Sequence, residues 1–467
     1  MSLNQVRLPV ADDQPELPSA ALPTDGRRRA IHPADVQGRF ARSRNAAFAI
    51  LLAIWAALPW IRVGGRQAVL LDVDARQLFL FGRTFNAQDT WLLFFLVTGV
   101  GFGLLYSTAL AGRVWCGYAC PQTVFLEGIF RRVQRLVEGP REKRMRRDAG
   151  PWGAEKLLRK GVSHAAYLAL SAAVAHVFLS YFMPARAAFG VVGQSPAAHP
   201  EAFAWVLAVT AFFYLNFGFF REQMCVVLCP YGRLQSALLD EHSFVVGYDL
   251  KRGEPRGKKG SAGAGDCVDC KRCIAVCPNG IDIRNGTQME CTACMACIDA
   301  CDQIMDRLDR PRGLIRYDSQ DGLAGKQRRI IRPRIVLYTV LMIIGAVVAT
   351  VATRRRSDFE VNLLRLTGEP YTMDDGLVRN ALQLHLVNKR SDAEVYRVEI
   401  EPADGMTVVM PMPTVRLAPL ADVRVPVFLS VPRDRFHGDF PVRASITREG
   451  DASNVVHVAG TFLGPSR

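Results

Sequence analysis

Five uncharged, apolar runs constrain the fold of this chain more than any other feature of its sequence. They are Asn45–Ile61, Thr90–Gly112, Val162–Met183, Ala202–Phe220 and Ile335–Ala352. A bilayer core of about 30 Å needs roughly 17–25 helical residues, so four runs are long enough and the first is at the lower limit. Buried core helices of a large soluble protein are the alternative, but five such runs are more than a soluble core explains. We therefore predict a multi-domain membrane protein with an α-helical transmembrane bundle of about five helices.

The charge of the chain is strongly basic but unevenly placed. Lys and Arg number 58 against 44 Asp and Glu, which gives a formal net charge of +14. The positive charge flanks the apolar runs, whereas a nucleic-acid-binding protein would spread it over one soluble face. The 49% hydrophobic content also excludes intrinsic disorder. A membrane, and no nucleic acid, is the expected environment.

Loop charge predicts the orientation of the helices. Residues 113–161 contain twelve Lys and Arg, whereas the loop between the third and fourth runs contains only Arg186. Basic loops stay in the cytoplasm, so the N-terminus, residues 113–161 and residues 221–334 are expected inside, and the C-terminal part outside. Arg354–Arg356, just after the last run, oppose this assignment. The polar N-terminal flank, with Arg27–Arg29, is too long for a signal-peptide n-region, so the first helix is expected to be retained.

Eight cysteines form two copies of the pattern C-x2-C-x2-C-x3-C, which is the spacing of a bacterial two-cluster ferredoxin. In that arrangement the fourth cysteine of each copy binds the other cluster. One [4Fe–4S] cluster is therefore predicted at Cys267, Cys270, Cys273 and Cys301. The second [4Fe–4S] cluster is predicted at Cys277, Cys291, Cys294 and Cys297.

The main alternative for these cysteines is zinc, which thiolates also bind in tetrahedral sites. Zinc sites usually take four ligands in two pairs, and not eight in two matching quartets, so the spacing favours iron–sulfur clusters. The second copy has Asp302 where the first has Pro278. Because this residue shapes the turn and is not a ligand, cluster binding is still expected. Two such clusters suit the transfer of single electrons.

The other four cysteines form an internal repeat. The pattern Cys-x3-Cys-Pro occurs twice, each time shortly after an apolar run and an arginine. Its cysteines are Cys116 and Cys120 in the first copy and Cys225 and Cys229 in the second. Thiols at i and i+4 of a helix share one face, so each pair could bind a metal or a redox partner, and the four could converge if the two hairpins pack together. Thiolates select Cu(I), zinc or an iron–sulfur centre, and Arg113 and Arg221 are expected to lower the thiol pKa values. Structural burial is the alternative for all four.

Two weaker features remain. His164 and His176 lie inside the third run, and intramembrane ionisable residues are functional suspects. His176 and Met183 could form a soft-metal pair, although a neutral, hydrogen-bonded histidine is the favoured interpretation. The tail from about residue 357 alternates apolar and polar residues over about seven short strands, which predicts an immunoglobulin-like β-sandwich.

Taken together, these motifs resemble the FixG/RdxA/CcoG family of accessory proteins for cbb-type cytochrome c oxidase. The resemblance spans nearly the whole chain: membrane hairpins with Cys-x3-Cys-Pro, the ferredoxin quartets, a last helix and a β-sandwich. It implies a cupric reductase-like activity, the reduction of Cu(II) to Cu(I) during oxidase assembly. The implied partners are copper, a cytoplasmic electron donor, copper chaperones or a copper transporter, and oxidase assembly proteins. The resemblance marks four cysteines as the copper or redox site: Cys116, Cys120, Cys225 and Cys229.

Two other functions remain open. A quinol-linked electron conduit to a periplasmic reductase would show quinone-dependent reduction of the clusters. A non-enzymatic assembly scaffold would still support oxidase assembly without clusters.

The predicted location is the bacterial inner membrane. The predicted domains are a cytoplasmic tail (1–44), a four-helix membrane region with both Cys-x3-Cys-Pro motifs (45–240), a cytoplasmic double [4Fe–4S] ferredoxin-type domain (241–330), a fifth transmembrane helix (331–353) and a periplasmic immunoglobulin-like domain (354–467).

Overall fold

The computed structural model describes residues 31–73, 75–85, 89–257, 263–354, 357–390 and 392–465. The chain divides into two compact units. The first comprises Met1–Arg62 with Phe95–Ala346, and the second comprises Val63–Phe94 with Val347–Arg467. The Arg27–Arg29 run, and Arg355 and Arg356 of the second basic run, lie outside the described residues.

Within the described ranges, five helices are long and apolar enough to cross a membrane. They are α1 (Arg39–Ala57), α2 (Thr90–Ala111), α7 (Ala154–Leu179), α9 (Pro200–Tyr214, continued by a π-helix, η5, over Leu215–Phe220) and α15 (Pro333–Arg354). Only 6–28% of each apolar stretch is buried inside the structure, so most of this surface needs an apolar solvent. In lipid the backbone must satisfy its own hydrogen bonds, and a helix does so. The chain is a membrane protein with five candidate transmembrane helices, as predicted.

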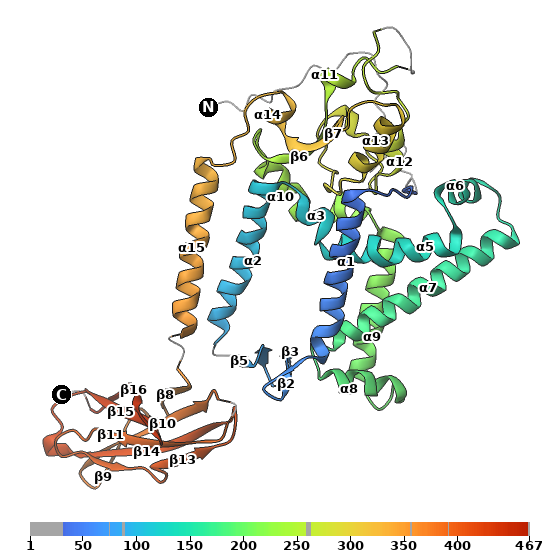
Figure 1. The fold of residues 1–467 in the computed structure, drawn as a ribbon. Helices are drawn as coiled ribbons and strands as arrows, with labels where there is room; N and C mark the ends of the chain where they lie inside the picture. The colour runs from blue at the N-terminus through green and yellow to red at the C-terminus, as the bar shows by residue number, and fades with distance from the viewer. Residues whose placement is uncertain are drawn as a thin grey trace. The chain divides into compact units, whose positions relative to one another are not determined.

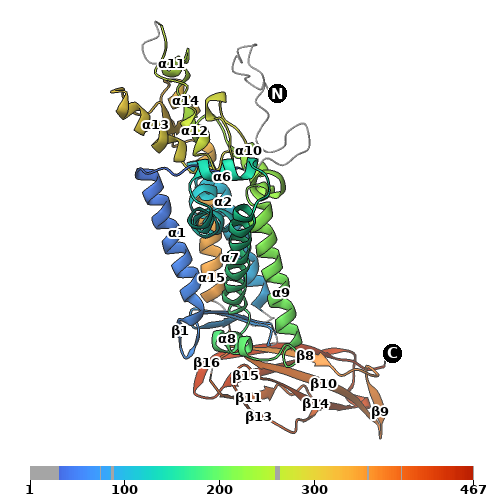
Figure 2. The ribbon, with the colours of Figure 1, turned by 90° about the vertical axis from the view of Figure 1, so that its right-hand side faces the viewer.

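One end of these helices meets the cysteine-rich segment (Figures 1 and 2). At the start of α1, the backbone N–H of Ala41 donates to Asp299 Oδ2 at 2.7 Å. At the end of α2, the Tyr317 hydroxyl donates to the Ala111 carbonyl at 2.5 Å. Just before α15, Arg332 pairs with Asp240 at 2.6 Å. We call this end of the helices the cluster end. Helix α1 begins at Arg39, ahead of the apolar run, because Asp299 caps it from a distant segment.

Short helices connect the long ones. In the first unit they are η1 (Leu58–Trp60), α3 (Val114–Tyr118), α4 (Pro121–Phe125), the π-helix η3 (Leu126–Phe130), α5 (Arg131–Glu138), α6 (Arg141–Ala149), α8 (Ala185–Gly190), η4 (Val191–Gly193), the π-helix η6 (Met224–Leu228) and α10 (Pro230–Leu238). An aromatic core that includes Phe130, Tyr167 and Phe217 joins η3, α7 and η5.

The cysteine-rich segment is built on a two-stranded antiparallel sheet of β6 (Phe244–Tyr248) and β7 (Ile315–Ser319). The chain between these strands supplies the cysteines. It also holds α11 (Leu250–Gly253), α12 (Arg272–Ala275), η7 (Ile283–Asn285) and α13 (Ala296–Arg307), and α14 (Gln320–Leu323) follows β7. Its core includes Val246, Ile298 and Met305. The predicted ferredoxin-type segment is therefore a compact layer at the cluster end.

The C-terminal part of the second unit is a β-sandwich. One sheet has the order β12-β14-β10-β8, with β9 beside β10, and the other has the order β13-β11-β15-β16. The strands are β8 (Phe359–Arg365), β9 (Thr372–Asp374), β10 (Leu377–Asn388), β11 (Glu394–Ile400), β12 (Thr407–Val409), β13 (Thr414–Leu417), β14 (Asp422–Pro432), β15 (Phe440–Arg448) and β16 (Asp451–Phe462); a short helix, η8 (Arg433–Arg435), follows β14. Alternate residues such as Leu384, Val427 and Ile446 fill the core. The predicted immunoglobulin-like fold is confirmed.

The sequence analysis missed a set of strands between the first two long helices. Strands β3 (Val69–Asp72), β4 (Gln77–Leu80) and β5 (Arg83–Phe85) form an antiparallel meander, and β1 (Arg62–Val63) pairs with β2 (Arg66–Gln67). Further along the same segment, Asp89 forms an ion pair with Lys389 at 3.1 Å. This pair links the segment to the sandwich within the second unit.

Candidate iron–sulfur centres

The structure gathers the eight ferredoxin-pattern cysteines around two cavities. Each quartet mixes cysteines from the two sequence copies, because Cys301 joins the first copy and Cys277 joins the second. The first cavity is lined by Cys267, Cys270, Cys273 and Cys301. The second is lined by Cys277, Cys291, Cys294 and Cys297, and also by Cys273, which lines both cavities. The ligation of clusters by these thiols remains a prediction, and the grouping is the one that ligand crossover requires.

The two cysteine loops share one backbone conformation. Asp269 and Lys271 have positive φ angles of 49° and 55°, and Ala293 and Met295, at the equivalent positions, have 49° and 61°. Such angles are uncommon for residues other than glycine and are found where a site demands them. Helices α12 and α13 begin directly after these residues, which places Cys273 and Cys297 in a first helical turn. The repeated strain indicates that both loops are shaped around the same kind of group.

Pro278 and Asp302 explain why the two copies end differently. Helix α12 stops at Ala275, because the residue before a proline is disfavoured in a helix. Helix α13 runs on to Arg307, since Asp302 imposes no such break. The Asp302 carboxylate instead accepts a hydrogen bond from Gly313 N at 3.0 Å. Both fourth cysteines still reach their cavities, so the departure from the ferredoxin pattern leaves the quartets complete.

The donor set fits clusters better than zinc. Burial raises the pKa of Cys273, Cys277 and Cys301 to about 12, so these thiols would stay protonated unless a cationic centre stabilised the thiolates. In the described part of the chain, no group of three or more His, Cys, Asp or Glu side chains could hold a single metal ion. A tetrahedral zinc site needs its sulfurs about 2.3 Å from one point, whereas a cubane holds them at separate corners.

The Cys-x3-Cys-Pro motifs also come together, although not on helix faces as expected. Cys116 lies in α3 and Cys225 in the π-helix Met224–Leu228, while Cys120 and Cys229 precede the prolines that begin α4 and α10. Both residues have an extended backbone, with ψ of 126° and 109°, because a following proline disfavours the helical conformation. The prediction of a shared i, i+4 helix face is therefore wrong.

The four thiols lie near one another. Burial, together with the neighbouring Cys120, Cys116 and Cys229, raises the pKa of Cys225 to about 12. A hydrogen-bond network crosses between the two motifs. The Cys116 thiol donates to Gln235 Oε1 at 3.2 Å, and Arg113 Nε donates to the same oxygen at 2.9 Å. Sequence reasoning overlooked Gln235, which follows the second motif.

The two arginines near these motifs behave differently from the expectation. Arg113 does lower the pKa of Cys116, but burial has the larger effect and raises it to about 11. The hydrogen bonds of Arg221 lead away from the thiols, because it donates to the Gly218 carbonyl at 3.0 Å and to the Tyr167 hydroxyl at 3.2 Å. The cation that lowers the pKa of Cys225 is Arg131, which is bound to Glu222 at 2.9 Å.

The first motif packs directly on the second cluster loop. A Cβ atom built on Gly117 would come within 2.8 Å of the carbonyl oxygens of Thr292 and Ala293. The neighbouring Tyr118 hydroxyl donates to Met295 Sδ at 3.6 Å. Arg113 donates to the Met289 carbonyl and lowers the pKa of both Cys116 and Cys291. The membrane-proximal thiols and the second quartet are thus neighbours.

The intramembrane histidines are hydrogen-bonded within the helices. His176 Nδ1 lies 2.7 Å from the Ala172 carbonyl one turn earlier, and His164 Nδ1 lies 3.2 Å from the Tyr214 hydroxyl. The His164 ring also stacks on Phe219. The contact of His164 therefore reaches a neighbouring helix, α9, whereas that of His176 stays within α7, and no described contact joins His176 to Met183.

Family models match three parts of the chain. A 4Fe-4S dicluster domain matches residues 220–320, which contain both ferredoxin quartets and the second Cys-x3-Cys-Pro motif. A 4Fe-4S binding domain matches residues 91–140, which contain Cys116 and Cys120. A model described as an IG-like fold at the C-terminal of FixG matches residues 349–465.

Several curated proteins are similar to this chain over most of its length. Protein RdxA of Cereibacter sphaeroides is 38% identical, over 81% of this chain and 84% of its own. The nitrogen fixation protein FixG of Rhizobium meliloti is 34% identical, over 88% of each chain. Protein RdxB of Cereibacter sphaeroides is 36% identical, over 80% of this chain and 82% of its own. A crystal structure of a FixG-related protein from Vibrio parahaemolyticus covers 23% of this chain at 14% identity, and its TM-score of 0.20 is too low to support an argument about the fold.

Proposed function

The chain belongs to the FixG/RdxA family of membrane-bound iron–sulfur electron-transfer proteins, and from this premise we propose that it reduces Cu(II) to Cu(I) for the assembly of a cbb-type cytochrome c oxidase. Each turnover adds one electron to one Cu(II) ion. The electron comes from a soluble cytoplasmic reductant of the flavin or iron–sulfur class. The observation that carries the proposal is the contact between Gly117 and the loop of Thr292 and Ala293, because it sets the thiol group beside the second quartet.

The chain's own residues have distinct roles in this proposal. When bound in the two quartets, [4Fe–4S] clusters would supply one-electron carriers. The copper substrate binds to two at a time of the four soft thiolates, those of Cys116, Cys120, Cys225 and Cys229, because no three described thiols surround one ion, and these ligands favour Cu(I) over Cu(II). Gln235 and Arg113 hold Cys116 in place across the two motifs. Tyr118 and Gly117 fix the distance between the thiol group and the second cluster loop.

The proposed orientation follows from the charges at the cluster end. Arg131, Arg132 and Arg135 of α5 lie at that end, as do Arg141–Arg147 of α6. Because basic segments stay inside, we place the N-terminus and the cluster end in the cytoplasm of a bacterium and the β-sandwich in the periplasm. The sandwich would then dock copper chaperones, a copper transporter or oxidase assembly proteins. A periplasm-specific reporter should be active when fused after Arg467 and inactive when fused near Gly260; reversed activities would overturn the orientation.

The decisive experiment is a Cu(II) reduction assay on the full chain purified without oxygen. Replacing Cys116, Cys120, Cys225 and Cys229 with Ser should leave the absorbance of the two clusters intact. Copper retention and the rate of Cu(II) reduction should fall at least about tenfold, because thiolates are the soft ligands that favour Cu(I). Leu228→Ala is the matched control, since Leu228 adjoins Cys229 but is 57% exposed. A quadruple variant that reduces and retains copper like the parent would refute this role for the thiols.

A second candidate for the thiol group is a third iron–sulfur cluster. The match of a 4Fe-4S binding domain to residues 91–140 favours it, since that segment has only Cys116 and Cys120 as cysteines. Two cysteines cannot complete a cubane, but the neighbouring Cys225 and Cys229 would supply the other two ligands. Iron analysis separates the candidates: about eight iron atoms per chain fit two clusters and about twelve fit three. In the second case the quadruple variant should lose four iron atoms.

A further inference from the structure

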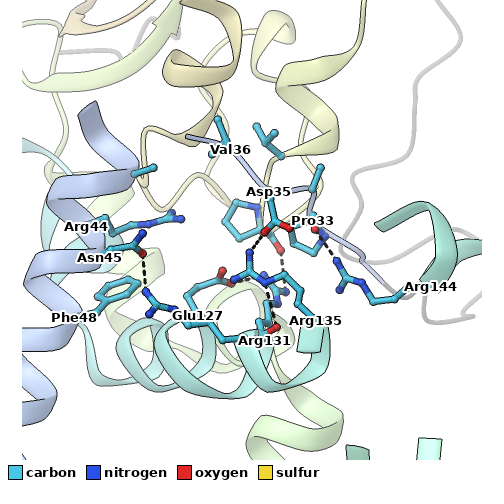
Figure 3. Close-up of a pocket in the computed structure, with 15 residues that line it drawn as sticks. Pro33, Asp35, Val36, Arg44, Asn45, Phe48, Glu127, Arg131, Arg135 and Arg144 are labelled. Atoms are coloured by element: carbon cyan, nitrogen blue, oxygen red, sulfur yellow. Dashed lines mark hydrogen bonds and ion pairs between the residues drawn. The ribbon is translucent and has the colours of Figure 1, made fainter. Parts of the chain in front are cut away.

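A basic cavity of about 360 Å³, which no cysteine lines, lies at the cluster end. Its size is within the range of about 300–1,000 Å³ that is typical of small-molecule sites. It opens between the segment before α1, the first turns of α1, and helices η3, α5 and α6 (Figure 3). Five arginines line it with only two carboxylates: Arg44, Arg131, Arg132, Arg135, Arg144, Asp35 and Glu127.

The carboxylates around the cavity are already engaged. Asp35 pairs with Arg135, and Glu127 pairs with Arg131. A third carboxylate, that of Glu222 outside the lining, also pairs with Arg131. The remaining arginines therefore face the cavity without a carboxylate partner among the described residues: Arg44, Arg132 and Arg144.

Neutral groups only partly satisfy these three arginines. Arg144 donates to the Pro33 carbonyl at 2.9 Å, and Arg132 donates to Asn45 Oδ1 at 2.8 Å. Arg44 makes no hydrogen bond with the described residues through its buried Nε and Nη1 atoms. Of the three, only Arg144 is buried, and burial, with the nearby Arg135, lowers the pKa of its guanidinium group, while Glu138 acts in the opposite direction.

Unpaired donors in fully buried side chains point to a missing ligand. Arg131 is 3% exposed and Arg144 is 1% exposed, and the Nε of each is buried without a hydrogen-bond partner in the described part of the chain. Leaving a charged donor buried and unsatisfied costs more than the roughly 1–3 kcal/mol of a neutral one. An anion with several acceptor oxygens would satisfy these donors and the charge together.

We propose that this cavity binds the phosphate group of an anionic ligand. Phosphate oxygens match the planar fork of arginine, which binds them through pairs of parallel hydrogen bonds. Arg44 and Phe48 belong to the first turns of a candidate transmembrane helix, so the cavity lies near the level of lipid headgroups. A phospholipid headgroup and a soluble phosphate compound would both present the same phosphate group to these arginines.

The site also touches the second quartet. Val276 and Pro278 line the cavity on either side of Cys277, and Arg131 donates to the Pro278 carbonyl at 3.1 Å. A phosphate bound to Arg131 and Arg144 would therefore brace the cysteine-rich segment against α5 and α6. This assignment does not depend on whether copper is the substrate of the thiol group.

Native mass spectrometry of the detergent-solubilised full chain tests the proposal in two arms. One arm adds dioleoylphosphatidylglycerol and the other adds inorganic phosphate. Arg44→Gln should weaken binding by about tenfold or more, since it removes a charge and three donors that no described residue satisfies. Arg42→Gln is the matched control, because Arg42 is an exposed neighbour on α1 that does not line the cavity. Arg144→Gln, compared with the exposed Arg146 of the same helix, repeats the test from a second element.

The outcomes separate the sources of the phosphate. Lipid adducts that Arg44→Gln abolishes and inorganic phosphate does not displace identify a lipid headgroup. Adducts of inorganic phosphate that depend on Arg44 identify a soluble phosphate compound. The proposal is overturned if the parent binds neither probe, or if Arg44→Gln and Arg42→Gln bind both probes as the parent does. The absorbance of the clusters reports whether each variant is folded.

Discussion

Gly117 lies against the backbone of Ala293, so closely that a Cβ atom on Gly117 would come within 2.8 Å of the Ala293 carbonyl oxygen. Gly117 sits between Cys116 and Cys120, and Ala293 sits between Cys291 and Cys294. The contact therefore joins the membrane-proximal thiol group to the loop of the second quartet. Only a residue without a side chain allows this approach.

Gly117→Ala should push the two motifs apart. Because the added methyl group meets backbone atoms that have little freedom to move, we expect a loss of about 1–3 kcal/mol in stability and a weaker second cluster. Thermal unfolding and the electron paramagnetic resonance signal of the reduced clusters measure these effects. Gly161→Ala is the control, since its Cβ would meet nothing within 4 Å. If both variants resemble the parent, the close contact has no structural importance.

Cys277→Ser tests the crossover of ligands between the two sequence copies. Cys277 follows the first three cysteines in sequence, but it lines the cavity of Cys291, Cys294 and Cys297. We therefore expect the variant to damage that second cluster and to spare the first. Iron analysis should show a loss of up to about four iron atoms per chain. Loss of only the cluster at Cys267, Cys270 and Cys273 would contradict the assignment.

The parts of the fold that could be predicted are those with a regular pattern. Transmembrane helices are recognised by the length of an apolar run, and ferredoxin quartets by a fixed cysteine spacing. Neither pattern depends on knowing the tertiary contacts. The meander of β3, β4 and β5 has strands of only three or four residues, too short for a clear alternation. The start of α1 was also missed, because its cap, Asp299, lies more than 250 residues away.

The thiol group shows the same limit at the level of single residues. The repeat of Cys-x3-Cys-Pro could be read directly, and so could the possibility that the four thiols converge. The sequence does not show which cation lies near which thiol, because Arg131, the first residue of α5, reaches the second motif through its ion pair with Glu222 and not through sequence proximity. Gln235 was missed for a similar reason, since a glutamine carries no signal until its acceptor is seen to join Cys116 and Arg113.

Acidification should destabilise the segment that leads into α1. Burial lowers the pKa of His32, although Asp148 at 2.9 Å acts in the opposite direction. The folded chain therefore holds His32 neutral, while the unfolded chain takes up a proton below a pH of about 6.5. Stability from this group is present above that pH and is lost as the pH falls below it, through the lowered pKa of the folded chain. The thermal midpoint of His32→Asn should drop less between pH 7.5 and 5.5 than that of the parent.

Asp89→Asn should destabilise the second unit. Asp89 and Lys389 form an ion pair at 3.1 Å, and their side chains are only 1% and 7% exposed. Removing one charge from a buried pair leaves the other poorly compensated, which typically costs about 3–5 kcal/mol. Because Lys389 keeps a second partner, Glu360 at 2.8 Å, we expect a loss at the lower end, about 3 kcal/mol.

The exposed pair of Arg379 and Asp374 provides the matched control for this prediction. These side chains are 45% and 57% exposed, and solvent screens their attraction at 2.9 Å. Asp374→Asn should therefore cost no more than about 1 kcal/mol. Thermal unfolding of the full chain, followed by far-ultraviolet circular dichroism, compares the two variants. Equal losses for Asp89→Asn and Asp374→Asn would show that burial of the first pair has no influence on the stability of the unit.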